Sequence, residues 1–282
     1  MSEAVINNKP QTKVKAFDKR IHEVDFFRGF LILLVLLDHL FNRFGTDNNF
    51  CLPLQQFFGG WYLPFQGRGV IRFLALAGFC FTSGVSSAFS KSNWKRAIEM
   101  LTFYAILTLG SNLLEIFLTD KGIVNFHFRI DFNIIGVLAF STFFYCLVQN
   151  RSWKALTAMT IGTFLLAFYV FPTFRDYSLP NTPDGQSLYG WSFYAPAFFR
   201  PEGTQADWMP LLPFMTFFLM GTIFSYFFYK EKKQSLFPKL KRNWERPICF
   251  MGRHSLLFYL GHQLVYIPIF MLLNAIPTWI GG

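Results

Sequence analysis

Residues 23–45 read EVDFFRGFLILLVLLDHLFNRFG, an apolar run whose ionisable side chains include Asp25, Arg28, Asp38 and His39. As an α-helix rising about 1.5 Å per residue, this run crosses most of a hydrocarbon core about 30 Å thick. A charged side chain near the bilayer centre costs about 2.5–3.5 kcal/mol, so such residues usually face the interior of a helix bundle. We therefore predict a membrane span with a functional polar face.

The spacing of these side chains places most of them on one side of that helix. Arg28 and His39 are eleven positions apart and point in nearly the same direction. Asp25 lies close to this direction, and Asp38 lies on a neighbouring flank. We expect a polar stripe that runs from one membrane face toward the other.

The composition extends this interpretation to the whole chain. Of 282 residues, 52% are hydrophobic and 15% are charged, and the apolar residues form blocks separated by short polar segments. This pattern predicts an all-α polytopic membrane protein, a helix bundle of about seven transmembrane helices. The expected spans are 25–44, 69–89, 97–118, 132–148, 155–171, 208–229 and 248–276.

The basic residues predict the orientation of this bundle. Loops on one side hold 17 Lys and Arg residues, against 6 on the other side. The positive-inside rule then places residues 1–22, a basic tail, in the cytoplasm and the C-terminus outside. Residues 23–282 form a single membrane domain with a long extracytoplasmic loop at 173–207. The net charge of +10 is explained by these loops and not by a nucleic-acid partner.

The four cysteines, Cys51, Cys80, Cys146 and Cys249, form no Cys-x-x-Cys pair. Three of them fall inside or beside expected spans. We therefore expect neither a disulfide framework nor a metal site, and no metal cofactor.

The last span has polar residues of its own. Arg253 and His254 lie near its cytoplasmic end, and His262 follows eight positions after His254, on nearly the same face of a continuous helix. Arg253 and Arg96 are expected at the cytoplasmic side, where they form a cationic mouth. This layout suits a reaction that takes one substrate from each side of the membrane.

Five blocks, in this order, carry a resemblance to a known family. The chain resembles the catalytic domain of the heparan-alpha-glucosaminide N-acetyltransferase family in its short bacterial form. The blocks are VDFFRGFLILLVLLDHLF at 24–41, FCFTSGVSSAFSKSNWKRA at 79–97, FNIIGVLAF at 132–140, DWMPLLPFMTFFLMG at 207–221 and FMGRHSLLFYLGHQ at 250–263.

The resemblance implies transfer of an acetyl (acyl) group from cytosolic acetyl-CoA (acyl-CoA) to an amine or hydroxyl of an extracytoplasmic carbohydrate acceptor. It also implies residence in the bacterial cytoplasmic (inner) membrane. The expected catalytic residues are His39, Asp38 and His262. The expected cofactor-binding residues lie in the blocks quoted above, and they are Arg28, Asp25, Arg96, Arg253, His254 and Ser83.

Several alternatives stay open at this point. His39 fits a general base or a nucleophile that forms an acyl-histidine intermediate, and each polar residue also has a purely structural interpretation. Arg28 and Asp25 are spaced to pair with each other on one helix. A proton-coupled transporter or permease is the rival function, although the chain has no internal repeat. A non-catalytic membrane partner is a third possibility, and the sequence leaves open whether the chain forms a homodimer.

Overall fold

The computed structural model describes residues 21–46, 51–65, 67–90, 92–120, 132–174, 209–229, 236–237 and 245–280. Within these ranges the chain is all-helical, as the sequence predicts. The elements in order are α1 (His22–Thr46), α2 (Leu52–Phe57), the π-helix η2 (Phe58–Tyr62), α3 (Gly67–Ala88), α4 (Asn93–Asp120), α5 (Ile134–Val148), α6 (Trp153–Phe174), α8 (Leu211–Phe228), α9 (Arg246–Arg253) and α10 (Ser255–Ile280).

Helices lie at each position where a span was expected. Four segments of the described chain are long and apolar enough to cross a membrane: Gly67–Ala88, Asn93–Leu114, Leu211–Phe228 and Ser255–Asn274. Ile134–Val148 and Trp153–Ala167 are shorter apolar helices. Helix α1 is 25 residues long and carries Asp25, Arg28, Asp38 and His39. The protein is a multi-pass helical membrane protein.

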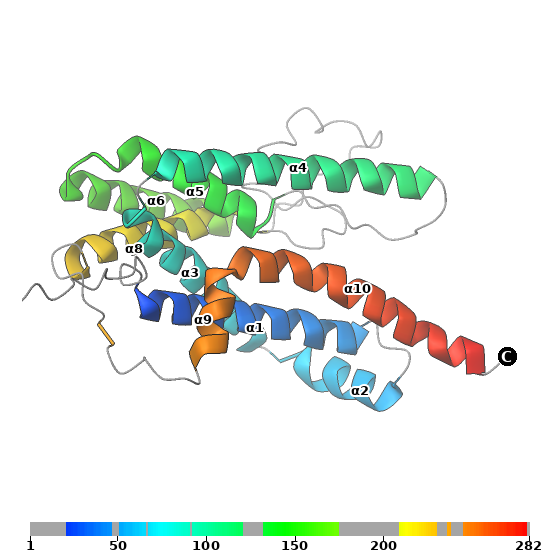
Figure 1. Ribbon diagram of the computed structural model, residues 1–282. Coiled ribbons are helices and arrows are strands. Elements are labelled where there is room, and N and C mark those ends of the chain that lie inside the picture. Colours follow the sequence, from blue (N-terminus) through cyan, green and yellow to red (C-terminus); the bar gives the residue numbers. More distant parts are fainter. Residues whose placement is uncertain are drawn as a thin grey trace, which may run out of the picture.

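The helices form two groups that meet along α3 (Figure 1). Helices α4, α5, α6 and α8 lie together, whereas α1, α9 and α10 form the other group, with α2 beside the C-terminal end of α1. Helix α3 packs against both α1 and α8. The core at this junction contains large buried side chains, including Ile32, Ile135, Phe218 and Leu219. The fold therefore places α1 and α3 side by side, with their polar residues between them.

Glycines allow the closest helix contacts, because a helix without a side chain at the crossing point lets another backbone approach. A Cβ on Gly84 of α3 would lie 1.9 Å from the carbonyl oxygen of Phe218 of α8. A Cβ on Gly221 of α8 would lie 2.0 Å from the carbonyl oxygen of Phe81 of α3. The two glycines lock the same crossing from both sides.

A second reciprocal pair of glycines joins α1 to α9. A Cβ on Gly29 would lie 1.8 Å from the carbonyl oxygen of Ile248, and a Cβ on Gly252 would lie 1.8 Å from that of Asp25. Helix α9 crosses α1 here, whereas α10 runs along α1 (Figure 1). Gly29 and Gly252, which lie next to Arg28 and Arg253, thus allow the backbones of α1 and α9 to come into contact.

This crossing corrects the prediction of one continuous helix over 248–276. The helix ends at Arg253, and the backbone of His254 (φ −110°, ψ 27°) leaves the helical region before α10 begins at Ser255. The physical reason is that α9 is held across α1 by the two glycines, so the chain has to turn before α10 can lie alongside α1. His254 and His262 therefore do not share a face of one helix.

Other boundaries also move. Helix α6 continues through Pro172 to Phe174, so the fifth span does not stop at the proline. Helix α3 begins at Gly67, which brings Arg68 into a helix and out of the preceding loop. The basic tail up to residue 20 and almost all of the long loop, from residue 175 to its end at 207, lie outside the described residues.

Candidate active site

The first cluster of polar side chains lies at the N-terminal end of α1. Arg28 reaches across to α3, where its Nη2 donates to the Ser86 hydroxyl at 2.8 Å and to the Thr82 carbonyl oxygen at 3.2 Å. Its Nε is buried and has no hydrogen-bond partner among the described residues. The guanidinium fork of Arg28 is therefore only partly used by α3.

Two further arginines surround this position. Arg96 at the start of α4 donates through Nη1 to the Ser87 hydroxyl at 3.2 Å, and its positive charge acts on Arg28. Arg253 at the end of α9 pairs with Asp25, with Nε and Oδ2 3.1 Å apart. Three cationic side chains from three helices thus gather at one end of the bundle. Such a group suits binding of a phosphate-bearing ligand.

The partners of Asp25 settle an alternative left open by the sequence. Asp25 forms an ion pair with Arg253 on α9, and Arg28 donates to α3. The two residues are therefore not simply an i, i+3 pair on the surface of α1. Each links α1 to a different helix.

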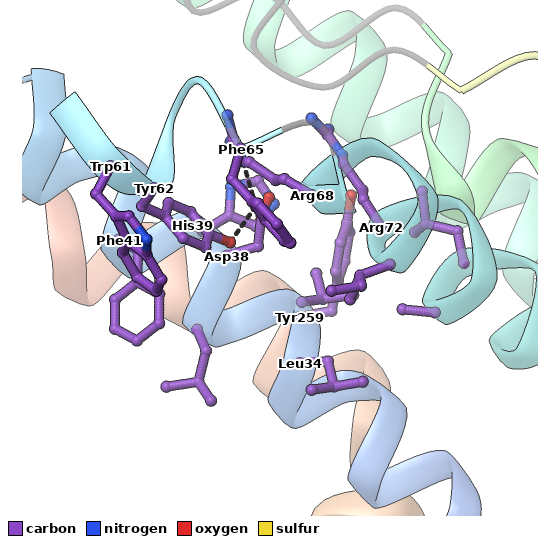
Figure 2. Close-up of a pocket in the computed structure, with 15 residues that line it drawn as sticks. Leu34, Asp38, His39, Phe41, Trp61, Tyr62, Phe65, Arg68, Arg72 and Tyr259 are labelled. Carbon is purple, nitrogen blue, oxygen red and sulfur yellow. Dashed lines mark hydrogen bonds and ion pairs between the residues drawn. The ribbon is translucent and has the colours of Figure 1, made fainter. Parts of the chain in front are cut away.

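The second cluster lies toward the other end of α1, around Asp38 (Figure 2). The Tyr62 hydroxyl and the Arg68 Nε both donate to Asp38 Oδ1 at 2.7 Å, and the Arg68 Nη2 donates to the Asn42 side chain at 3.0 Å. Burial and the hydrogen bond to Asp38 raise the pKa of Tyr62 to about 12, so its hydroxyl remains a donor at neutral pH. These contacts hold α1, η2 and the start of α3 together.

His39 lies beside this network and against the last helix. Its ring contacts the ring of His262 on α10, with centroids 4.8 Å apart. His262 is buried, and its Nδ1 bonds to the backbone carbonyl oxygen of Tyr259. A carbonyl oxygen only accepts, so Nδ1 carries a proton, and in the neutral ring Nε2 then keeps its lone pair. This Nε2 has no hydrogen-bond partner among the described residues.

A cavity of about 260 Å³ opens at this point. Asp38 and His39 line it, together with Arg68 and Arg72 of α3. Aromatic rings also face it, and Figure 2 shows Trp61, Tyr62 and Phe65 around the same space. The pocket thus combines one imidazole ring, a carboxylate held in an ion pair and two arginines in a mainly apolar lining, with the ring of His262 packed against His39. Such a pocket suits proton transfer and the stabilisation of negative charge on an oxygen atom.

The comparison with protein families then decides what kind of protein carries this site. The model of the family described as "Heparan-alpha-glucosaminide N-acetyltransferase, catalytic" matches residues 20–264. The chain belongs to this family. No curated protein and no solved structure matches it. As a member of the heparan-alpha-glucosaminide N-acetyltransferase family with several apolar helices, the protein is a membrane enzyme of the acetyltransferase type.

In the structure, most of the residues predicted to be catalytic or to bind CoA form two groups. Asp38, His39 and His262 meet at the cavity end, although Asp38 bonds to Tyr62 and Arg68, and no direct bond between Asp38 and His39 is among its contacts. The residues expected to bind CoA, namely Arg28, Asp25, Arg96 and Arg253, meet at the opposite end.

Two residues predicted to bind CoA lie differently. His254 is exposed in the break between α9 and α10, where its ring packs on Phe250 with centroids 4.7 Å apart. Ser83 is buried, and its carbonyl oxygen accepts a bond from the Ser87 hydroxyl, which in turn accepts from Arg96. Ser83 therefore supports the arginine cluster through the backbone of α3, and its role in binding CoA stays a prediction.

Sequence reasoning missed Arg68, Arg72 and the role of Tyr62. In the sequence Arg68 precedes the expected second span at 69–89, and Arg72 lies within that apolar span. A carboxylate such as Asp38 inside a membrane nevertheless needs a cationic partner. That requirement was the signal available in the sequence. It did not say which of the arginines in the neighbouring segments would provide the partner.

Proposed function

We propose that this protein transfers an acyl group, acetyl first of all, from cytosolic acyl-CoA to the amine or hydroxyl of an extracytoplasmic sugar. The observation that carries the proposal is His39, which lines the cavity and whose ring contacts His262 behind it. The Nε2 of His262 is buried and has no hydrogen-bond partner among the described residues. Membership in the heparan-alpha-glucosaminide N-acetyltransferase family supports acetyl transfer as the reaction class.

The arginine cluster is the proposed site for the phosphates of CoA. Arg28 has a buried Nε without a protein partner among the described residues, and Arg96 acts on it as a second positive charge. A guanidinium fork matches phosphate oxygens in geometry and charge. Arg28 and His39 are eleven residues apart on α1, which corresponds to about 16 Å along the helix axis. The extended arm of CoA would carry its thioester over this distance to the histidines.

In the proposed reaction His39 takes a proton from the acceptor amine or hydroxyl as that group attacks the thioester carbonyl carbon. The C–S bond breaks, and the CoA sulfur leaves as a thiolate that takes up a proton. His262, whose ring contacts His39, would accept a hydrogen bond from the protonated His39 through Nε2. Arg72 lines the same cavity and would stabilise the negative oxygen of the tetrahedral intermediate.

The aromatic side chains of η2 and its surroundings are the proposed acceptor contacts. Trp61, Tyr62 and Phe65 line the cavity, and flat rings of this kind offer apolar faces to a sugar ring. We place this end of the bundle on the extracytoplasmic face of a bacterial inner membrane, in accordance with the positive-inside bias of the loops.

The test uses the purified full-length protein in detergent with radiolabelled acetyl-CoA and a panel of amino sugars. We expect wild type to bind acetyl-CoA and transfer label. His39→Ala should bind acetyl-CoA with unchanged affinity and lose transfer, because it lacks the proton acceptor. Arg28→Ala should weaken binding. Lys154→Ala is the matched control for loss of a positive charge, because Lys154 is exposed on α6, where it lies over the Trp153 ring and belongs to neither cluster.

Two results would contradict the proposal. Transfer by His39→Ala at the wild-type rate would remove the histidine from the reaction. Wild-type protein that neither binds acetyl-CoA nor acts on longer acyl-CoAs, but takes up a solute in proteoliposomes, would favour a transporter. Mass spectrometry of acid-quenched enzyme would separate direct transfer from an acyl-histidine intermediate.

A further inference from the structure

A third cluster lies where α9 begins and α1 begins, apart from the cavity and its histidines. His22 is the first residue of α1, Glu245 directly precedes α9, and Cys249 lies one helical turn further on. The His22 Nε2 is 3.0 Å from Glu245 Oε2 and 3.5 Å from Cys249 Sγ. One ligand atom from each residue lies within 4.8 Å of the other two.

The local structure holds these atoms in place. Glu245 has helical backbone angles (φ −81°, ψ −16°), so it and Cys249, four residues later, lie on the same face of α9. The reciprocal contacts of Gly29 and Gly252 press this helix against α1. His22 is thereby brought to the helix from 223 positions away in the sequence.

Burial distinguishes this cluster from an ordinary surface ion pair. Glu245 is 0% exposed and Cys249 is 1% exposed, while the His22 side chain is 25% exposed. A carboxylate buried this completely requires a close positive charge. A protonated His22 can supply such a charge, and a divalent cation bound by the three side chains can supply it as well.

The donor set and the spacing fit zinc. Thiolate sulfur, imidazole nitrogen and carboxylate oxygen are the common protein ligands of Zn²⁺. With Zn–N and Zn–O near 2.1 Å and Zn–S near 2.3 Å, tetrahedral ligands lie about 3.4 Å apart for N and O and about 3.6 Å apart for N and S. The observed separations of 3.0 Å and 3.5 Å are close to these values.

We propose that His22, Glu245 and Cys249 bind one Zn²⁺ ion, with water as the fourth ligand. The metal would displace the proton of the Cys249 thiol and balance the thiolate and the Glu245 carboxylate with its two positive charges. The ion would fasten the start of α1 to α9, the helix that presents Arg253 to Asp25. This proposal is independent of acyl transfer, and it departs from the expectation of a protein without metal.

The experiment measures metal on the purified full-length protein. The protein is stripped of metal with a chelator, incubated with Zn²⁺ and passed through gel filtration. Wild type should then retain about one zinc per chain, as measured by elemental mass spectrometry. Cys249→Ser and His22→Ala should retain almost none. Cys51→Ser is the matched control and should retain zinc as wild type does, because Cys51 lies outside the cluster.

Cobalt provides a second measurement that depends on the thiolate itself. Co²⁺ bound in the site should give a thiolate-to-metal charge-transfer absorption in wild type and in Cys51→Ser, and Zn²⁺ should abolish it by displacement. If Cys249→Ser fails to fold, the wild-type spectrum still decides. Wild-type protein that holds no more zinc than Cys249→Ser, or that gives no thiolate band with Co²⁺, overturns the proposal and leaves a His22–Glu245 ion pair.

Discussion

The crossing of α1 and α9 offers the sharpest test of how this protein is packed, through the substitution Gly252→Ala. The added Cβ would lie 1.8 Å from the carbonyl oxygen of Asp25 and 2.9 Å from the backbone nitrogen of Gly29. Both obstacles are backbone atoms, which cannot rotate away as the end of a flexible side chain can. The two helices therefore have to separate.

The required movement follows from the structure. An ordinary van der Waals contact of a Cβ begins at 3.4 Å, so the helices must move apart by about 1.6 Å at this point. Overpacking of this kind costs about 1–3 kcal/mol, and the better helix propensity of alanine returns up to about 1 kcal/mol. The net loss should lower the melting temperature by about 3–8 °C. The 3.1 Å contact between Arg253 and Asp25 should be lost at the same time.

The assay is thermal unfolding of the purified protein in detergent, with Gly261→Ala as the control. Gly261 lies within α10, and nothing lies within 4 Å of the position of its added Cβ. Alanine there should leave the melting temperature unchanged or raise it. Gly29→Ala should reproduce the loss, because it meets the Ile248 carbonyl oxygen from the other side. If Gly252→Ala is as stable as Gly261→Ala, the two helices do not cross at these glycines.

Three further predictions concern the two polar clusters. Arg68→Ala leaves the mostly buried Asp38 carboxylate without its ion pair and should destabilise the protein by about 1–3 kcal/mol in thermal unfolding. Lys95→Ala is the control, because it removes only an exposed ion pair with a glutamate 3.8 Å away, and it should cost about 0.5 kcal/mol or less. Arg28→Lys keeps the positive charge but loses the planar fork, so equilibrium binding should show acetyl-CoA affinity reduced by about tenfold, and unchanged affinity would place the phosphates elsewhere. His262→Phe keeps a ring against α1 without the Nε2 lone pair, so the transfer rate should fall by about 10²-fold or more with little change in acetyl-CoA affinity; an unaltered rate would make His262 purely structural.

Much of the architecture was accessible from the sequence because a bilayer imposes simple length and composition rules. Apolar blocks of sufficient length predict helices, and helices lie at all the expected positions in the described chain. The ionisable residues of α1 also marked the polar interior correctly, since a charge in a membrane span is costly without a partner. The same rules say little about helix ends, which explains the errors at Pro172, Gly67 and His254.

The sequence by itself determined the class of protein, the positions of the helical spans and the presence of ionisable side chains within them, because hydrophobic length and charge are properties of each segment alone. Only the tertiary structure decided which of those side chains meet. Arg68 reaches Asp38, His262 contacts His39, and His22 joins Cys249, each from a different segment of the chain. These meetings depend on where helices cross, and the crossings depend on reciprocal contacts such as Gly29 with α9, which are properties of two surfaces together.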